Sequence, residues 1–292
     1  MIWIVKCAMR HYTTLIDSHT LAAQLAREDL VLFDCRSELG NAHWGAAEYA
    51  NSHLPGALYL HLDRDLSSPI TPTSGRHPLP DPETFARRMG DLGVGPGVQV
   101  VAYDQSNGAY AARLWWLLRW IGFRDVAVLD GGLAAWRAAG LPLDNAVPTP
   151  APRALPMALD TRAVVSSATV DDLRLKPGNL LVDARGAERF AGRNETIDPI
   201  AGHVPGARNL PFPGNLGVDG KFLSPDNMRR RWSTLLGSQP PSALIAMCGS
   251  GVTACHNLLA LEHAGLAGAR LYAGSWSEWI RDVKRPVATG SY

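Results

Sequence analysis

A cysteine at the end of an apolar run is the residue of this chain best suited to chemistry. Cys248 follows five apolar residues, and the segment after it reads Gly249, Ser250, Gly251, Val252 and Thr253. An apolar helical pattern then covers residues 257–264, so the sequence predicts a buried strand, a tight loop and a helix. The two glycines let the backbone fold closely around the sulfur, and the loop N–H groups and helix N-terminus then favour a thiolate. We therefore expect Cys248 to be a nucleophile, the alternative being a small apolar residue buried at a strand end.

The cysteine loop belongs to the second of two copies of one sequence pattern. Four short motifs recur in the same order, and the two members of a pair stand 143 (274 − 131) to 150 (203 − 53) residues apart. The pairs are residues 34–36 with 183–185, 53–57 with 203–207, 100–104 with 245–248, and 131–136 with 274–279. Chance is a poor explanation for four motifs in one order, so the chain contains two copies of one domain.

Each copy alternates short apolar runs with amphipathic helical patterns. This alternation predicts an α/β fold of two tandem domains, each a mainly parallel sheet with helices on both faces. We expect an N-terminal domain over residues 1–140, a Pro-rich linker over 141–160 and a C-terminal domain over 161–292. Ligands of such sheets bind beyond the carboxyl ends of the strands, which is where Asp104 and Cys248 are expected.

The composition bears on partners, location and cofactors. There are 28 basic and 27 acidic residues, so we expect no nucleic-acid partner. No apolar run is long enough for a membrane span, and the first residues lack the apolar region of a signal peptide, so we expect no membrane partner and a cytoplasmic location. The cysteines show no C-x-x-C spacing and the histidines no metal-ligand spacing, so neither a disulfide framework nor a metal or other cofactor is expected. The four cysteines are Cys7, Cys35, Cys248 and Cys255.

The two copies differ at the residues that would do the chemistry. The first copy has Asp104 where the second has Cys248, and Gly40 where the second has Arg189. A carboxylate cannot act as a sulfur nucleophile, and it repels an anionic substrate. We therefore expect one active site, in the second domain, with the first domain as a wall that contributes loop residues.

With these motifs, the chain resembles the tandem rhodanese-like sulfurtransferases over nearly its whole length. The resemblance implies an inactive first domain and a second-domain cysteine that carries a persulfide. The loop Cys-Gly-Ser-Gly-Val-Thr, residues 248–253, is similar to that of members that use 3-mercaptopyruvate, whereas thiosulfate-using members have Cys-Arg-Lys-Gly-Val-Thr. A loop without Lys or Arg also suits a monoanion better than a dianion.

The resemblance and the residue types together suggest roles. We expect Cys248, Ser250 and Asp63 to be catalytic, with Ser250 contacting the reacting sulfur or a keto oxygen and Asp63 orienting Ser250 or assisting proton transfer. Arg189 matches the arginine that holds the substrate carboxylate, and Arg193 is the expected substitute for a second such arginine that has no clear match here. The other substrate-binding residues that we expect are His77, Gly249, Gly251, Val252 and Thr253.

The predicted reaction is transfer of a sulfane sulfur from 3-mercaptopyruvate, through a persulfide on Cys248, to an acceptor, with release of pyruvate. The acceptor would be a thiol, such as a thioredoxin-like dithiol, or cyanide. Thiosulfate as the donor is the alternative within this enzyme class. A non-catalytic rhodanese-like binding module is a second alternative, but such modules usually lose the cysteine. A Cys-based phosphatase requires an arginine six residues after the cysteine, where this chain has Ala254.

Overall fold

The computed structural model describes residues 11–290, and its first half folds around a five-stranded parallel sheet. Cys7 lies outside the described residues. The strand order is β1-β5-β4-β2-β3. The strands are β1 (Leu15–Ile16), β2 (Leu30–Asp34), β3 (Ala57–Tyr59), β4 (Gln99–Tyr103) and β5 (Val126–Leu129).

The second half folds around a four-stranded parallel sheet with the order β7-β6-β8-β9. Its strands are β6 (Leu180–Asp183), β7 (Arg208–Asn209), β8 (Leu244–Met247) and β9 (Arg270–Leu271). This order repeats β3-β2-β4-β5 of the first sheet, and an isolated parallel bridge from Val164 to Leu271 stands where β1 would be. The predicted fold of two tandem α/β units with parallel sheets is confirmed.

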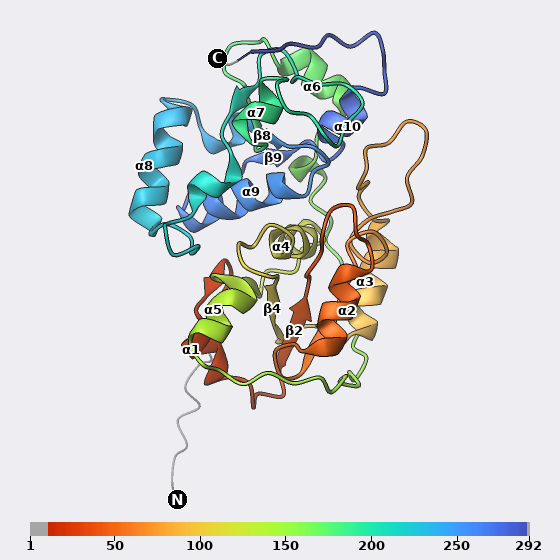
Figure 1. The fold of residues 1–292 in the computed structure, drawn as a ribbon, viewed down its shortest axis with the longest axis vertical. Helices are drawn as coiled ribbons and strands as arrows, with labels where there is room; N and C mark the ends of the chain where they lie inside the picture. The colour runs from red at the N-terminus through yellow and green to blue at the C-terminus, as the bar shows by residue number, and fades with distance from the viewer. Residues whose placement is uncertain (1–10, 291–292) are drawn as a thin grey trace, which may run out of the picture.

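Helices cover both faces of each sheet (Figure 1). Along β4, Val100 and Ala102 pack in the same apolar cluster as α3 and α4, whereas Val101 packs with α1 and α5. This alternation follows from the two-residue period of a strand. The first-half helices are α1 (Ser18–Ala22), α2 (Trp44–Asn51), α3 (Pro82–Asp91), α4 (Ala111–Trp120) and α5 (Gly132–Ala138). The second-half helices are α6 (Ser167–Leu173), α7 (Ala187–Phe190), α8 (Pro225–Leu236), α9 (Thr253–His263) and α10 (Ser275–Trp279), and three short 3-10 helices cover Thr161–Ala163, Phe212–Asn215 and Pro241–Ala243.

Helices α4 and α9 pack against each other at the seam between the two halves (Figure 1). Their apolar side chains belong to one continuous cluster that reaches both sheets, and Trp115 of α4 and Leu258 of α9 are members. Trp115 is 1% exposed and anchors the two halves to each other. One hydrophobic core therefore joins the halves, and the N-terminal ends of both helices point to the same region.

The Pro-rich segment 141–160 lies along the first half and contains no regular helix or strand. Asp144 exchanges backbone hydrogen bonds with His53, and the backbone N–H of Asp160 donates to the Trp120 carbonyl at the end of α4. Its prolines prevent regular structure, so the segment is an extended connection. Within residues 11–290, no helix has the length and apolar character that a membrane span requires.

Candidate active site

Cys248 follows the last residue of β8, in a loop that folds around its sulfur. The side chain is a free thiol and is 2% exposed. The Gly251 N–H donates to Sγ over 3.1 Å, and the Cys248 N–H donates to the Ser275 hydroxyl over 3.0 Å. Gly251 has a φ of +80°, and a Cβ there would collide with the Ala273 carbonyl, so the loop requires glycine. The strand end and the tight loop thus hold the sulfur against a backbone donor.

Cys248 lines a cavity of about 280 Å³ whose walls come from both halves of the molecule. The first half contributes Arg76 and the segment before α4, including Tyr110. Of the residues predicted for the site, the cavity lining includes Arg189, Cys248, Gly249, Ser250, Val252 and Thr253. Gly251 contributes its N–H from behind the sulfur rather than a lining surface.

Ser250, His77 and Asp63 form a hydrogen-bonded chain that crosses from one half to the other. The Ser250 hydroxyl lies 2.7 Å from His77 Nδ1, and His77 Nε2 lies 3.3 Å from Asp63 Oδ1. Because Asp63 accepts from Nε2–H, Nδ1 is the acceptor for the serine hydroxyl. Burial lowers the pKa of His77 despite the opposing effect of Asp63, and the hydrogen bond from His77 lowers the pKa of Asp63. The chain therefore joins a neutral imidazole to a carboxylate, an arrangement that can accept and return a proton.

Arg189 lines the cavity but is already held by two carboxylates. Its Nε and Nη2 donate to Glu195 over 2.9–3.1 Å, and Nη2 also contacts Asp198 over 3.1 Å. Asp198 in turn pairs with Arg76 from the first half. The acidic pair thus fixes both guanidinium groups in position.

The free ends of these two arginines flank Gly249 in the cysteine loop. A Cβ at Gly249 would lie 2.8 Å from Arg76 Nη2 and 3.7 Å from Arg189 Nη1. Neither nitrogen has a hydrogen-bond partner among residues 11–290. Sequence analysis missed Arg76, although it adjoins the predicted His77. Two unpaired guanidinium ends beside Cys248 form a place for a carboxylate.

The structure does not bring Arg193 to this cavity. Its guanidinium makes two bonds to Glu188, of 2.6 and 2.8 Å, at the surface, and both side chains are more than half exposed. Arg185 does line the cavity. Its Nε and Nη2 donate to the Asp183 carboxylate, and its Cζ lies 5.0 Å from the centroid of the Trp276 ring. Arg185 is thus a brace for the strand end as well as a wall residue.

Arg113 of α4 is a fully buried cation behind the cysteine loop. It donates to the carbonyl oxygens of Gly251, His77 and Leu66 over 3.1–3.4 Å. It has no carboxylate partner in the part of the chain that the structure describes. Arg113 therefore ties the His77 segment to the cysteine loop and places a positive charge behind the sulfur.

The corresponding loop of the first half is filled by its own side chain. Asp104 is fully buried and accepts from the N–H groups of Ser106, Gly108, Tyr110 and Ala111 over 2.9–3.2 Å. Its carboxylate takes the loop donors that an anionic ligand would need. No group of three or more His, Cys, Asp or Glu side chains in residues 11–290 could hold a metal ion.

The rhodanese-like domain family matches residues 17–139 and 167–282. The chain is 50% identical over 278 residues to the "Probable 3-mercaptopyruvate sulfurtransferase" of Pseudomonas aeruginosa, with 94% of this chain and 98% of that protein covered. It is 35% identical over 245 residues to the thiosulfate sulfurtransferase of Cricetulus griseus, with 81% and 80% covered. The solved 3-mercaptopyruvate sulfurtransferase from Leishmania major gives a TM-score of 0.80 at 35% identity, with 91% of this chain and 74% of that one covered.

These relatives extend across both sheets and the seam between them, so the likeness concerns the paired architecture and not one domain alone. The two matched ranges also coincide with the two copies of the sequence pattern. The chain belongs to the tandem-domain rhodanese-like sulfurtransferases.

Proposed function

We propose that the protein transfers sulfur from 3-mercaptopyruvate, through a persulfide on Cys248, to a thiol or to cyanide, and releases pyruvate. The observation that carries this proposal is the meeting, at one cavity, of Cys248, the Ser250–His77 hydrogen bond and two free arginine ends. A thiolate, a proton relay and a carboxylate-binding pair are the three functions that this donor requires.

In the first half-reaction, the Cys248 thiolate attacks the sulfur of the donor. An S–S bond forms and the C–S bond breaks, with its electron pair leaving on carbon as the enolate of pyruvate. The enolate then takes one proton. The Gly251 N–H, 3.1 Å from Sγ, stabilises the thiolate before attack and the persulfide afterwards.

The Ser250–His77–Asp63 chain supplies the proton transfer. As the S–S bond forms, the Ser250 oxygen takes the thiol proton of the donor and passes its own proton to His77 Nδ1. The imidazolium then returns a proton through Ser250 to the enolate carbon, which gives pyruvate. Asp63 stabilises the imidazolium that forms for a moment. Asp63 and His77 thus act from the first half on chemistry in the second.

The donor carboxylate lies between Arg76 Nη2 and Arg189 Nη1. This position is beside Gly249, which directly follows Cys248 in the chain. A three-carbon donor bound there by its carboxylate can reach Cys248 with its sulfur. The neighbouring carboxylates of Glu195 and Asp198 hold the arginines and cancel part of their charge. The net positive charge that remains on this group of side chains suits a monoanion better than a dianion.

In the second half-reaction, an acceptor nucleophile attacks the outer sulfur and regenerates the Cys248 thiolate. A small thiol, cyanide or an exposed dithiol of a thioredoxin-like protein has the required chemistry. Cys35, Cys248 and Cys255 are all free thiols, which supports a reducing compartment such as the cytoplasm.

The first experiment measures the intact mass after each donor alone, together with steady-state transfer from 3-mercaptopyruvate and thiosulfate. We expect a gain of one sulfur that is absent in Cys248→Ser, and a clear preference for 3-mercaptopyruvate. No sulfur gain with either donor would overturn the persulfide proposal.

Thiosulfate as the donor is a second candidate, favoured by one observation. Arg76, Arg185 and Arg189 all line the cavity, so cations are present although the loop itself has none. A sulfur gain with thiosulfate preferred would retain the Cys248 chemistry and establish this candidate. The double change Gly249→Arg, Ser250→Lys should shift preference toward thiosulfate, and Arg76 Nη2, 2.8 Å from a Cβ at position 249, belongs to a flexible side chain that can move aside. An unchanged preference would contradict the role given to the loop.

A further inference from the structure

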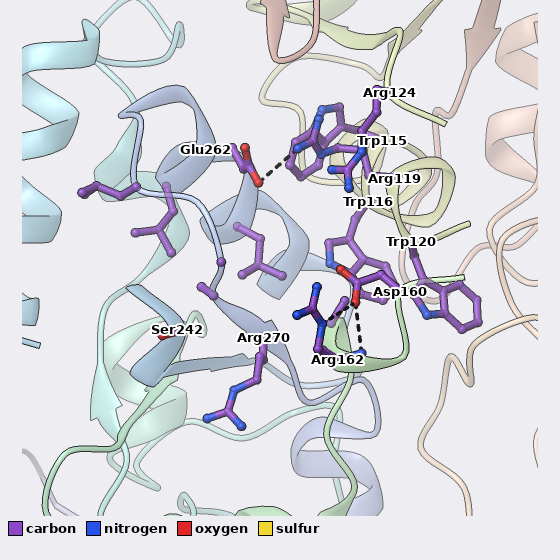
Figure 2. A pocket seen from close by; sticks show the side chains of 16 residues that line it. Trp115, Trp116, Arg119, Trp120, Arg124, Asp160, Arg162, Ser242, Glu262 and Arg270 are labelled. Carbon is purple, nitrogen blue, oxygen red and sulfur yellow. Dashed lines mark hydrogen bonds and ion pairs between the residues drawn. The ribbon is translucent and has the colours of Figure 1, made fainter. Parts of the chain in front are cut away.

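A second cavity, of about 330 Å³, opens at the seam between the two halves and contains none of the residues assigned to sulfur transfer (Figure 2). Its walls come from the C-terminal part of α4, from α9, from the start of β9 and from the segment that follows the linker. The volume lies in the range of small-molecule sites in proteins, about 300–1,000 Å³. It holds a two-ring molecule but not a folded domain.

One wall of this seam cavity is aromatic. Trp115, Trp116 and Trp120 all come from α4, and the rings of Trp116 and Trp120 are stacked with centroids 5.7 Å apart (Figure 2). The Trp115 N–H is already bonded to the Thr13 carbonyl, so that ring is fixed. Leu258 and Leu261 of α9 also line the cavity. A planar apolar ring is the shape that such walls bind best.

The rim of the seam cavity carries an excess of positive charge. Four arginines line it, against two carboxylates. Arg119 pairs with Glu262 over 3.1 Å and Arg162 with Asp160 over 3.6 Å. The remaining two arginines are Arg124 and Arg270.

Arg124 and Arg270 have no ion pair within residues 11–290, and Arg270 Nε is buried without a hydrogen-bond partner. A buried donor without a partner is rare in folded proteins and marks a place where a ligand group can bind. An anion is the partner that an unpaired guanidinium prefers.

We propose that the seam cavity binds a small planar aromatic carboxylate, with its ring against the tryptophans and its carboxylate at Arg124, which lies at the opposite end of the cavity from Arg270 in Figure 2. A neutral aromatic compound would leave the Arg124 guanidinium unpaired, and an aliphatic acid would lose the ring contacts. The site is separate from sulfur transfer, because Cys248 and the arginines beside it line a different cavity.

The test is calorimetric titration of the whole protein with three probes of similar size. These are indole-3-carboxylate, its neutral carboxamide, and cyclohexanecarboxylate. We expect indole-3-carboxylate to bind at least about tenfold more tightly than either control, since each control lacks one of the two kinds of contact. Bound ligand should also raise the melting temperature, because it binds the folded protein and not the unfolded chain.

Substitutions locate the binding. Arg124→Gln and Trp120→Leu should each weaken indole-3-carboxylate about tenfold, whereas Arg87→Gln, an exposed change on α3, should have no effect. Arg124 is exposed, so its loss leaves the fold intact. Equal binding of all three probes, no binding of any, unchanged binding in both variants, or displacement by pyruvate would each overturn the proposal.

Discussion

Arg113 Nη1 in the first half donates to the carbonyl oxygen of Gly251 in the second, over 3.3 Å. The same guanidinium holds the carbonyl of His77 over 3.1 Å. One buried side chain therefore fixes the distance between the two segments that must cooperate at Cys248. No carboxylate neutralises it among the described residues, and burial lowers the pKa of Arg113, opposed by the neighbouring Cys255 and Cys248 thiols.

Arg113→Met should lower the rate of Cys248 alkylation by iodoacetamide at pH 7 about tenfold, because the buried cation behind the cysteine loop is lost together with its hydrogen bond to the Gly251 carbonyl. The rate of sulfur transfer should fall in the same variant, since the His77 segment is released from the cysteine loop. Arg113→Lys should recover part of the alkylation rate by restoring the charge. Arg87→Met is the control, and unchanged alkylation in Arg113→Met would show that the charge does not act on Cys248.

The pH profile of sulfur transfer should report the state of His77. Burial holds the pKa of His77 below its ordinary value of about 6.5, so the acid limb of kcat/KM should lie below that pH. Asp63→Asn removes a contact that raises this pKa, so the acid limb should move to lower pH while the maximum rate falls about tenfold. An acid limb that shifts upward, or an unchanged maximum rate, would argue against the relay.

Arg76→Met should raise KM for 3-mercaptopyruvate at least about tenfold, because one charge-assisted contact to the carboxylate is lost. Arg193→Met is the matched control and should leave KM unchanged, since Arg193 binds Glu188 at the surface. Steady-state kinetics of the two variants decide the matter. A larger effect of Arg193→Met would restore the sequence-based expectation for that residue.

His256 of α9 should make stability depend on pH. Its Nε2 donates to the Asn107 carbonyl across the seam over 3.0 Å, its ring stacks on Phe222, and burial lowers its pKa to about 4. Between pH 6.5 and 4 the unfolded chain binds one proton more than the folded chain. The free energy of unfolding therefore decreases as the pH is lowered through this range, by up to about 3 kcal/mol.

Urea unfolding at pH 7 and pH 5 tests this dependence. His256→Gln should lose less stability than the natural protein between the two pH values, because the titrating group is gone. His43→Gln, at an exposed position, should behave like the natural protein. An equal loss in all three proteins would assign the pH dependence to other groups.

The sequence contains enough to predict the fold and the place of Cys248 in a tight loop after a buried strand. Apolar runs of four or five residues between helical patterns, such as 244–247, indicate buried strands. The repeated motifs indicate the duplication. The glycines beside Cys248 indicate a loop that closes on the sulfur, which the Gly251 N–H confirms. These features are local, so sequence spacing describes them well.

The arginines could not be assigned in the same way. Arg193 is the expected substitute for a second carboxylate-binding arginine because it lies in the corresponding stretch of the sequence, but Glu188 holds it at the surface. Arg76 comes from the other half of the chain, and its position depends on how one domain packs against the other. His77 and Ser250 are likewise 173 residues apart in sequence. Contacts across the seam depend on tertiary packing, which motif spacing does not encode.

The apolar cluster that α4 and α9 share has a consequence for how the enzyme moves and melts. Because one core reaches both sheets, the halves cannot swing apart without exposing Trp115 and Leu258 to water. Substrates must therefore enter and leave the cysteine cavity while the halves stay packed together. Heating should accordingly melt the whole chain in a single cooperative transition, and a cut within residues 141–160 should leave two fragments that stay associated.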